Sequence, residues 1–240
     1  MQGLKNPLYR KRVVFYGDSI KEGFPLKGIY YWAKIIGERN EMIWRNFGVG
    51  GGTVTADLYR KVLGSARHWL SRSIDTTKER VPELDYLIFD GGANDADNLK
   101  DLPEKFGEYK IDDFSGNYDD NTFTGALETL FYKAIHHYPK AKIGFIVLHK
   151  MGIHECGYGE DCYYRRFLLR EIEICKKWGI PYIDLWETST LNPTLPCYYD
   201  PNLDRDGNER EGMAYLDGQH LSTTGYNLVA DKIEAWMRTL

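Results

Sequence analysis

Three residues that together could form a nucleophilic site occur near the two ends of this chain. Ser19 follows the apolar residues 13–16 and a Gly-Asp turn, and Asp217 stands just before His220 in the segment Asp-Gly-Gln-His. A serine hydroxyl is a weak nucleophile at neutral pH. It attacks a carbonyl carbon only with an imidazole in hydrogen-bond reach and a carboxylate that orients the imidazole. The three residues therefore predict serine hydrolase chemistry.

Two further segments carry groups that can hold the negative charge of a tetrahedral intermediate. The apolar run at 42–44 leads to Asn46 and a glycine triplet at 50–52, and the apolar run at 86–89 leads to Gly91-Gly92-Ala93-Asn94. Glycine N–H groups and an asparagine amide are suitable donors, and the missing Cβ of glycine lets a substrate approach the backbone. The segments together predict one site.

These four segments, in this order, resemble the four sequence blocks of the SGNH hydrolase superfamily, the GDSL-type esterases and acylhydrolases. The resemblance extends along nearly the whole chain. It implies that Ser19 is the nucleophile and that Asp217 and His220 complete a catalytic triad. It also implies an oxyanion hole formed by Ser19, Gly51 and Asn94.

One position in these blocks is ambiguous, and another departs from the family pattern. The family places its oxyanion glycine five residues after the asparagine of the second block, which selects Gly51 when counted from Asn46, but the glycines on either side leave this choice open by one position. Lys21 stands where the family commonly has threonine. We interpret this departure as one that affects substrate preference more than mechanism.

Each motif also has an ordinary structural interpretation. Gly-Asp-Ser favours surface turns, the Gly-Gly-Ala-Asn segment suits a strand-to-helix turn, and Asp217 could cap the start of a helix. Any one of them alone would decide little. Their joint occurrence in order, with the first three after predicted strands, favours the hydrolase interpretation.

The elements that must position these residues alternate along the chain. We predict strands at 12–16, 42–46, 86–90, 142–148 and 181–185, and helices at 29–39, 54–71, 122–137, 163–178 and 223–237. Such alternation is typical of an α/β fold with a parallel sheet covered on both faces. The resemblance implies a three-layer α/β/α, flavodoxin-like five-stranded sheet of order 2-1-3-4-5. Ligands bind at the carboxyl ends of such strands, where Ser19, Gly51 and Asn94 fall.

Composition limits the remaining possibilities. The 240 residues, 42% of them hydrophobic, suffice for one domain spanning residues 1–240. A net charge of −4 argues against a nucleic-acid partner. The polar start of the chain has no apolar signal region, and no run reaches the length of a membrane helix, so we expect a cytoplasmic protein without a membrane partner. We make no prediction of oligomeric state.

We expect no cofactor and no metal. A zinc site from His149, His154, Cys156 and Cys162 lacks a C-x-x-C pair. All four cysteines are expected to be reduced, although Cys156 and Cys162 could close a loop. A nucleotide or flavin phosphate in the first loop is disfavoured because two carboxylates, of Asp18 and Glu22, stand there.

The expected substrate is a short-chain acyl ester, above all an O-acetyl ester, on a small molecule or a carbohydrate. The 18 tyrosines and 6 tryptophans could provide stacking surfaces for sugar rings. The long connection 95–121 is predicted to shape the pocket, and a second long connection, 187–216, leads into Asp217. Two alternatives stay open: a lysophospholipase or thioesterase with the same catalytic residues, and a carbohydrate-binding relative without activity.

Overall fold

The chain folds around a parallel β-sheet. The computed structural model describes residues 6–23, 31–56, 70–152, 157–159, 161–202 and 210–240. Within these ranges the sheet contains β1 (Arg12–Gly17), β2 (Ile43–Gly48), β3 (Tyr86–Phe89), β4 (Lys142–Val147) and β5 (Tyr182–Asp184). All neighbouring strands are parallel and their order is β2-β1-β3-β4-β5. This confirms the predicted strand order.

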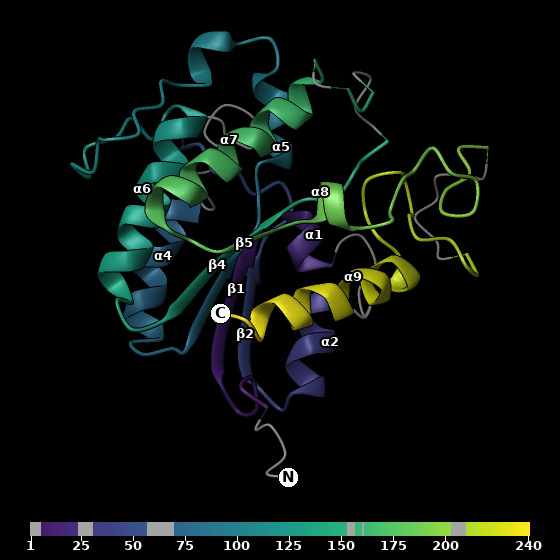
Figure 1. Ribbon diagram of the computed structural model, residues 1–240, viewed down its shortest axis with the longest axis horizontal. Helices are drawn as coiled ribbons and strands as arrows, with labels where there is room; N and C mark the ends of the chain where they lie inside the picture. Colours follow the sequence, from purple (N-terminus) through teal and green to yellow (C-terminus); the bar gives the residue numbers. More distant parts are fainter. Residues whose placement is uncertain (1–5, 24–30, 57–69, 153–156, 160, 203–209) are drawn as a thin grey trace.

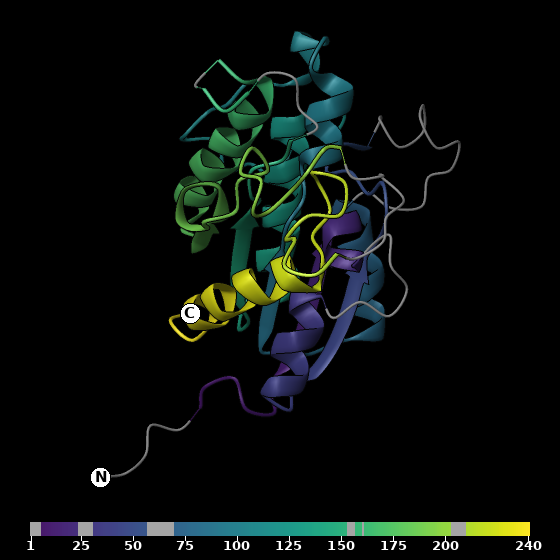
Figure 2. The ribbon, with the colours of Figure 1, turned by 90° about the vertical axis from the view of Figure 1, so that its right-hand side faces the viewer.

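Helices cover both faces of the sheet (Figure 1). On one face α2 (Trp32–Arg39) contacts α9 (Thr223–Met237), and Figure 2 shows the two helices lying against each other. On the other face α6 (Phe123–His137) contacts both α4 (Leu70–Arg80) and α7 (Tyr163–Trp178). Because central parallel strands are buried from both sides, they are apolar at nearly every position, as in β3, whose four residues are all buried.

Capping residues set the ends of the long helices. Ser222 caps α9 by accepting the N–H of Gly225 at 3.1 Å, as the run of hydroxyl residues there predicts. Thr122 caps α6 in the same way through the N–H of Gly125. The predicted helices 163–178 and 223–237 agree with α7 and α9 at both ends.

The predicted helix at 54–71 differs from the structure at both ends. Residues 54 and 55 are not helical, 57–69 lie outside the described residues, and α4 runs from Leu70 to Arg80, beyond the predicted end. This helix buries Leu70, Ile74 and Thr77 on one face and carries charged or hydroxyl side chains between them, so its apolar stripe is narrow. The sequence pattern therefore places the end of the helix too early.

The connection 95–121 also differs from the prediction. Its beginning belongs to α5 (Ala93–Leu99), and a short turn of helix, η1 (Pro103–Lys105), follows. The Phe106 ring then packs edge-on against Phe167 of α7, and the Gly107 carbonyl accepts a hydrogen bond from Arg170. This part of the connection thus packs on α7.

One cysteine departs from the expected reduced state. Cys162 is disulfide-bonded, whereas Cys175 and Cys197 are free. Among the residues that the structure describes, no three His, Cys, Asp or Glu side chains gather as a metal site, and His154 and Cys156 of the weighed zinc site lie outside them. None of the helices in the described ranges is both long and apolar enough to cross a membrane.

Candidate active site

The loop after β1 carries Ser19 into the short helix α1 (Ser19–Glu22). Asp18 caps this helix through a 2.9 Å hydrogen bond from the N–H of Ile20. Burial and the neighbouring Asp90 raise the pKa of Asp18 to about 7. A Cβ at Gly17 would lie 1.7 Å from Oδ1 of Asp90, so only glycine fits at this position. Asp18 thus orders the turn that presents Ser19.

A hydrogen-bond chain joins the two ends of the sequence at Ser19. His220 Nε2 lies 2.9 Å from Ser19 Oγ, and His220 Nδ1 lies 2.7 Å from Asp217 Oδ2. Ser19 is 6% exposed and His220 is 9% exposed. Because an ionised carboxylate only accepts hydrogen bonds, Asp217 places the proton on Nδ1 and leaves Nε2 to accept the serine proton. The structure thus brings all three predicted triad residues together.

Asp217 also shapes the turn that carries His220. Its Oδ1 accepts the backbone N–H groups of Gln219 at 2.9 Å and His220 at 2.7 Å. Burial by itself raises the pKa of Asp217, but the hydrogen bonds from the His220 ring and these two N–H groups outweigh burial and hold the pKa below its usual value. Asp217 is therefore ionised at neutral pH.

Residues 149–152, which follow β4, form hydrogen bonds with the turn that carries His220. His149 Nε2 lies 3.0 Å from the carbonyl oxygen of Gln219, and the N–H of Gly152 donates to the carbonyl of Gly218 at 2.7 Å. Burial lowers the pKa of His149 to about 4, so the imidazole is neutral and its Nε2–H donates to Gln219. Sequence reasoning considered His149 only as a zinc ligand and missed this supporting contact.

The three N–H groups of the glycine triplet at 50–52 do not share the same hydrogen-bond acceptor. The Gly50 N–H donates to Glu22 Oε2 at 2.6 Å, and the Gly52 N–H donates to the carbonyl of Val49 at 2.8 Å. Gly51 has a positive φ of 71°, and within the part of the chain that the structure describes its N–H has no partner. Among the described residues, Gly51 is therefore the member of the triplet whose N–H is not already engaged.

Asn94 lies in the first turn of α5, close to the second block. Its Nδ2 donates to the carbonyl of Gly52 at 2.9 Å, which uses one of the two amide protons. The next residue, Asp95, is buried and accepts the N–H groups of Val54 and Thr55, each at 2.9 Å. Asp95 thus ties the second block to the third.

These groups open into a cavity of about 480 Å³ at the carboxyl end of β1. The described residues that line it are Ser19, Glu22, Val49, Gly50, Gly51, Asn94, Gln219 and His220. The connection 95–121 contributes none of them, so its predicted role in shaping this cavity is wrong. No tyrosine or tryptophan of the described ranges lines the cavity either. The ring systems instead fill the core, as in the stack of Tyr16 on Phe89.

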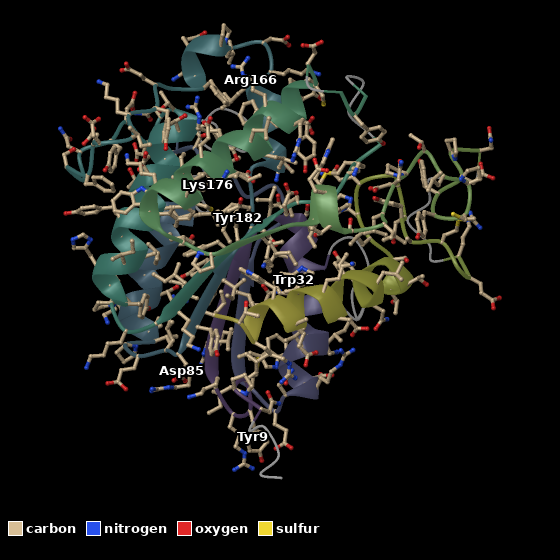
Figure 3. The ribbon with its side chains drawn as sticks, in the orientation of Figure 1. Tyr9, Trp32, Asp85, Arg166, Lys176 and Tyr182 are labelled. Carbon is tan, nitrogen blue, oxygen red and sulfur yellow. The ribbon has the colours of Figure 1, made fainter. Side chains whose placement is uncertain are left out.

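Lys21 does not line the cavity, which corrects its interpretation as a residue of substrate preference. Its side chain is fully buried, with Nζ 2.9 Å from Asp90 Oδ2 and 3.6 Å from the ring centre of Trp32. Trp32 begins α2 and is labelled in Figure 3. Burial lowers the pKa of Lys21 to about 8, against the opposing pull of Asp90. The lysine anchors α1 beneath the site.

Comparison with known proteins gives the family. The model of the GDSL-like lipase/acylhydrolase family matches residues 15–228, so the chain belongs to this family and is a hydrolase of ester bonds. The family confirms the resemblance that the four sequence blocks suggested. No curated protein sequence matches the chain.

Solved structures agree with this fold over almost the whole chain. A protein from Lactobacillus plantarum is similar with a TM-score of 0.69 and 18% identity, covering 96% of this chain and 98% of that one. A protein described as a GDSL-like lipase from Bacteroides ovatus has a TM-score of 0.61, 19% identity and coverages of 96% and 99%. The acetyl xylan esterase AlAXEase has a TM-score of 0.58, 17% identity and coverages of 95% and 100%. At these identities the likeness shows the fold alone.

Proposed function

We propose that the protein is a serine esterase that removes short acyl groups, above all acetyl, from hydroxyl groups of small molecules or carbohydrates. The observation that carries this proposal is the hydrogen-bond chain from Asp217 through His220 to Ser19, which ends at an open cavity. Geometry of this kind gives a hydroxyl both the base that it needs and a fixed direction of attack.

The proposed reaction runs through an acyl-enzyme. His220 Nε2 takes the proton as Ser19 Oγ bonds to the ester carbonyl carbon, and Asp217 stabilises the imidazolium without being protonated itself. The oxyanion accepts hydrogen bonds from the N–H groups of Ser19 and Gly51 and from the Asn94 amide. His220 then returns its proton to the departing alcohol. A water molecule, activated by the same imidazole, releases the acid and restores Ser19.

The lining of the cavity supports a short acyl group. Val49 is the only aliphatic side chain among the described lining residues, and the others are glycines or polar residues. A long acyl chain would gain about 0.8 kcal/mol for each buried methylene only where apolar surface receives it. A solved neighbour acts on acetylated xylan by its name, which supports a carbohydrate acetyl ester as one substrate. None of the three neighbours described above is named as a lysophospholipase or a thioesterase.

A series of p-nitrophenyl esters from acetate to decanoate tests this function. We expect kcat/KM to be highest for acetate or butyrate and to fall with longer chains, because the described lining gives no apolar channel for them. Release of nitrophenolate by purified protein is the measurement. A maximum at octanoate or decanoate would contradict the short-chain proposal. Absence of turnover on every ester and on acetylated oligosaccharides would favour the carbohydrate-binding alternative.

Replacement of Asn94 tests the oxyanion hole. We expect Asn94→Ala to lower kcat by about 10² to 10³, since the loss of one oxyanion donor has this effect in serine hydrolases. The ground-state carbonyl gains less from the amide than the tetrahedral intermediate does, so KM should change little. Steady-state kinetics on p-nitrophenyl acetate measure the effect. Asn227→Ala, on the exposed side of α9, is the matched control with wild-type kinetics. Unchanged kcat in Asn94→Ala would remove this residue from the site.

A further inference from the structure

We propose that Glu22 makes this site selective for esters without negative charge near the scissile bond. The inference rests on the proposed esterase function and extends it to a class of substrate. Glu22 ends α1, the short helix that Ser19 begins, so the chain itself places its carboxylate beside the nucleophile. The residue is exposed and lines the cavity.

A backbone contact fixes the direction of the Glu22 side chain. Oε2 accepts the N–H of Gly50 at 2.6 Å, directly before the glycine that offers its N–H to the oxyanion. A charge-assisted hydrogen bond of this length holds the carboxylate over the second block. The negative charge therefore stays at the rim of the cavity.

No cation within the described lining offsets this charge. Glu22 is the only carboxylate among those residues, and none of them is a lysine or an arginine. The adjacent Lys21 points into the core and pairs with Asp90. The other nearby acid, Asp217, pairs with His220. Among the described lining residues, the Glu22 carboxylate therefore has no lysine or arginine beside it.

The negative charge of Glu22 distinguishes two classes of ester. A carboxylate or phosphate on the acyl or alcohol part would bring like charges together, and at a separation of roughly 8 Å in partly hydrated surroundings the repulsion costs about a fivefold loss of kcat/KM. A hydroxyl-rich neutral alcohol instead meets an acceptor, because a carboxylate has lone pairs beyond those used by one N–H. The site therefore favours neutral polyol or sugar esters over lysophospholipids and acyl thioesters of anionic carriers.

The test compares two esters of equal length that differ at one terminal group. Mono-4-nitrophenyl fumarate carries a terminal carboxylate where 4-nitrophenyl trans-crotonate ends in a methyl group, and the trans double bond keeps that carboxylate from attacking its own ester. The measured quantity is the ratio of kcat/KM for the crotonate to kcat/KM for the fumarate. Glu22→Gln keeps an acceptor for the Gly50 N–H and removes only the charge. Glu22→Ala removes both. Glu79→Gln, an exposed residue near the end of α4, is the control for net charge.

We expect the ratio to fall about fivefold in Glu22→Gln and in Glu22→Ala, and to stay at the wild-type value in Glu79→Gln. In the wild type the ratio should also shrink as ionic strength rises from 0.02 to 0.5 M, because salt screens exposed charges. An equal ratio in the wild type and Glu22→Gln, with both esters hydrolysed, would overturn the inference and leave the esterase function intact. A wild type that hydrolyses neither ester would overturn both.

Discussion

Ser19→Ala and His220→Ala are each expected to lower kcat by roughly 10⁴- to 10⁶-fold, and the double variant is expected to be no slower than Ser19→Ala alone. The reason is the 2.9 Å contact between Ser19 Oγ and His220 Nε2. The hydroxyl attacks only as its proton transfers to the imidazole. Loss of the Ser19 hydroxyl or of the His220 imidazole therefore removes the same step, the nucleophilic attack. What remains comes from the oxyanion donors and from binding.

The measurement is steady-state hydrolysis of p-nitrophenyl acetate, with titration by a nitrophenyl phosphonate as a second readout. The phosphonate should add one covalent adduct to the wild type and none to Ser19→Ala. His136→Ala, an exposed histidine on α6, is the control that should keep full activity. Additive losses in the double variant, or an adduct on Ser19→Ala, would place the nucleophile elsewhere.

The largest expected effect on stability comes from the buried pair of Lys21 and Asp90. Lys21→Met should lower the free energy of unfolding by about 3–5 kcal/mol, because it leaves the carboxyl group of Asp90 buried without its cation. Asp90→Asn should have a comparable effect, since it leaves the buried ammonium group against the rings of Phe15 and Trp32 without its paired carboxylate. Urea unfolding at pH 7 measures both.

The double variant Lys21→Met/Asp90→Asn separates the loss of the pair from the cost of an unpaired charge. It should be more stable than either single variant, since it buries no uncompensated charge. The exposed pair of Arg10 and Glu41, 3.7 Å apart, provides the control, and Glu41→Gln should change stability by less than about 1 kcal/mol. If Lys21→Met lowered the free energy of unfolding by less than about 1 kcal/mol, the structural role of the Lys21–Asp90 pair would be contradicted.

The alternation of strands and helices and the meeting of the site residues could be predicted because the signals are local, whereas the strand order came from the family resemblance. The apolar runs before Ser19 and Asn94 end in small or polar residues, and parallel strands bring all their carboxyl ends to one edge of the sheet. Ser19 and Asn94 needed no knowledge of packing for their approximate placement. The ends of α7 and α9 could be predicted equally well, since a glycine ends α7 and a hydroxyl residue begins α9.

The buried polar contacts could not be predicted, because they join residues far apart in sequence. Nothing local to Lys21 indicates that Asp90 lies opposite it, and nothing local to Asp95 indicates Val54 and Thr55. Glu171 is the extreme case: it stands in an ordinary amphipathic helix, yet burial raises its pKa well above the usual value. A helical pattern shows that such a face is buried, but not what it meets.

The hydrogen bond between Ser19 and His220 spans 201 positions of the chain. Closing so long a loop is entropically costly and comes after local structure has formed. During synthesis, a ribosome-bound chain can assemble most of the sheet and still be inert towards esters, because its imidazole has not left the exit tunnel. Hydrolysis would begin only once the segment that leads into α9 has emerged and docked. Ester turnover by nascent chains of increasing length would therefore report the completion of folding.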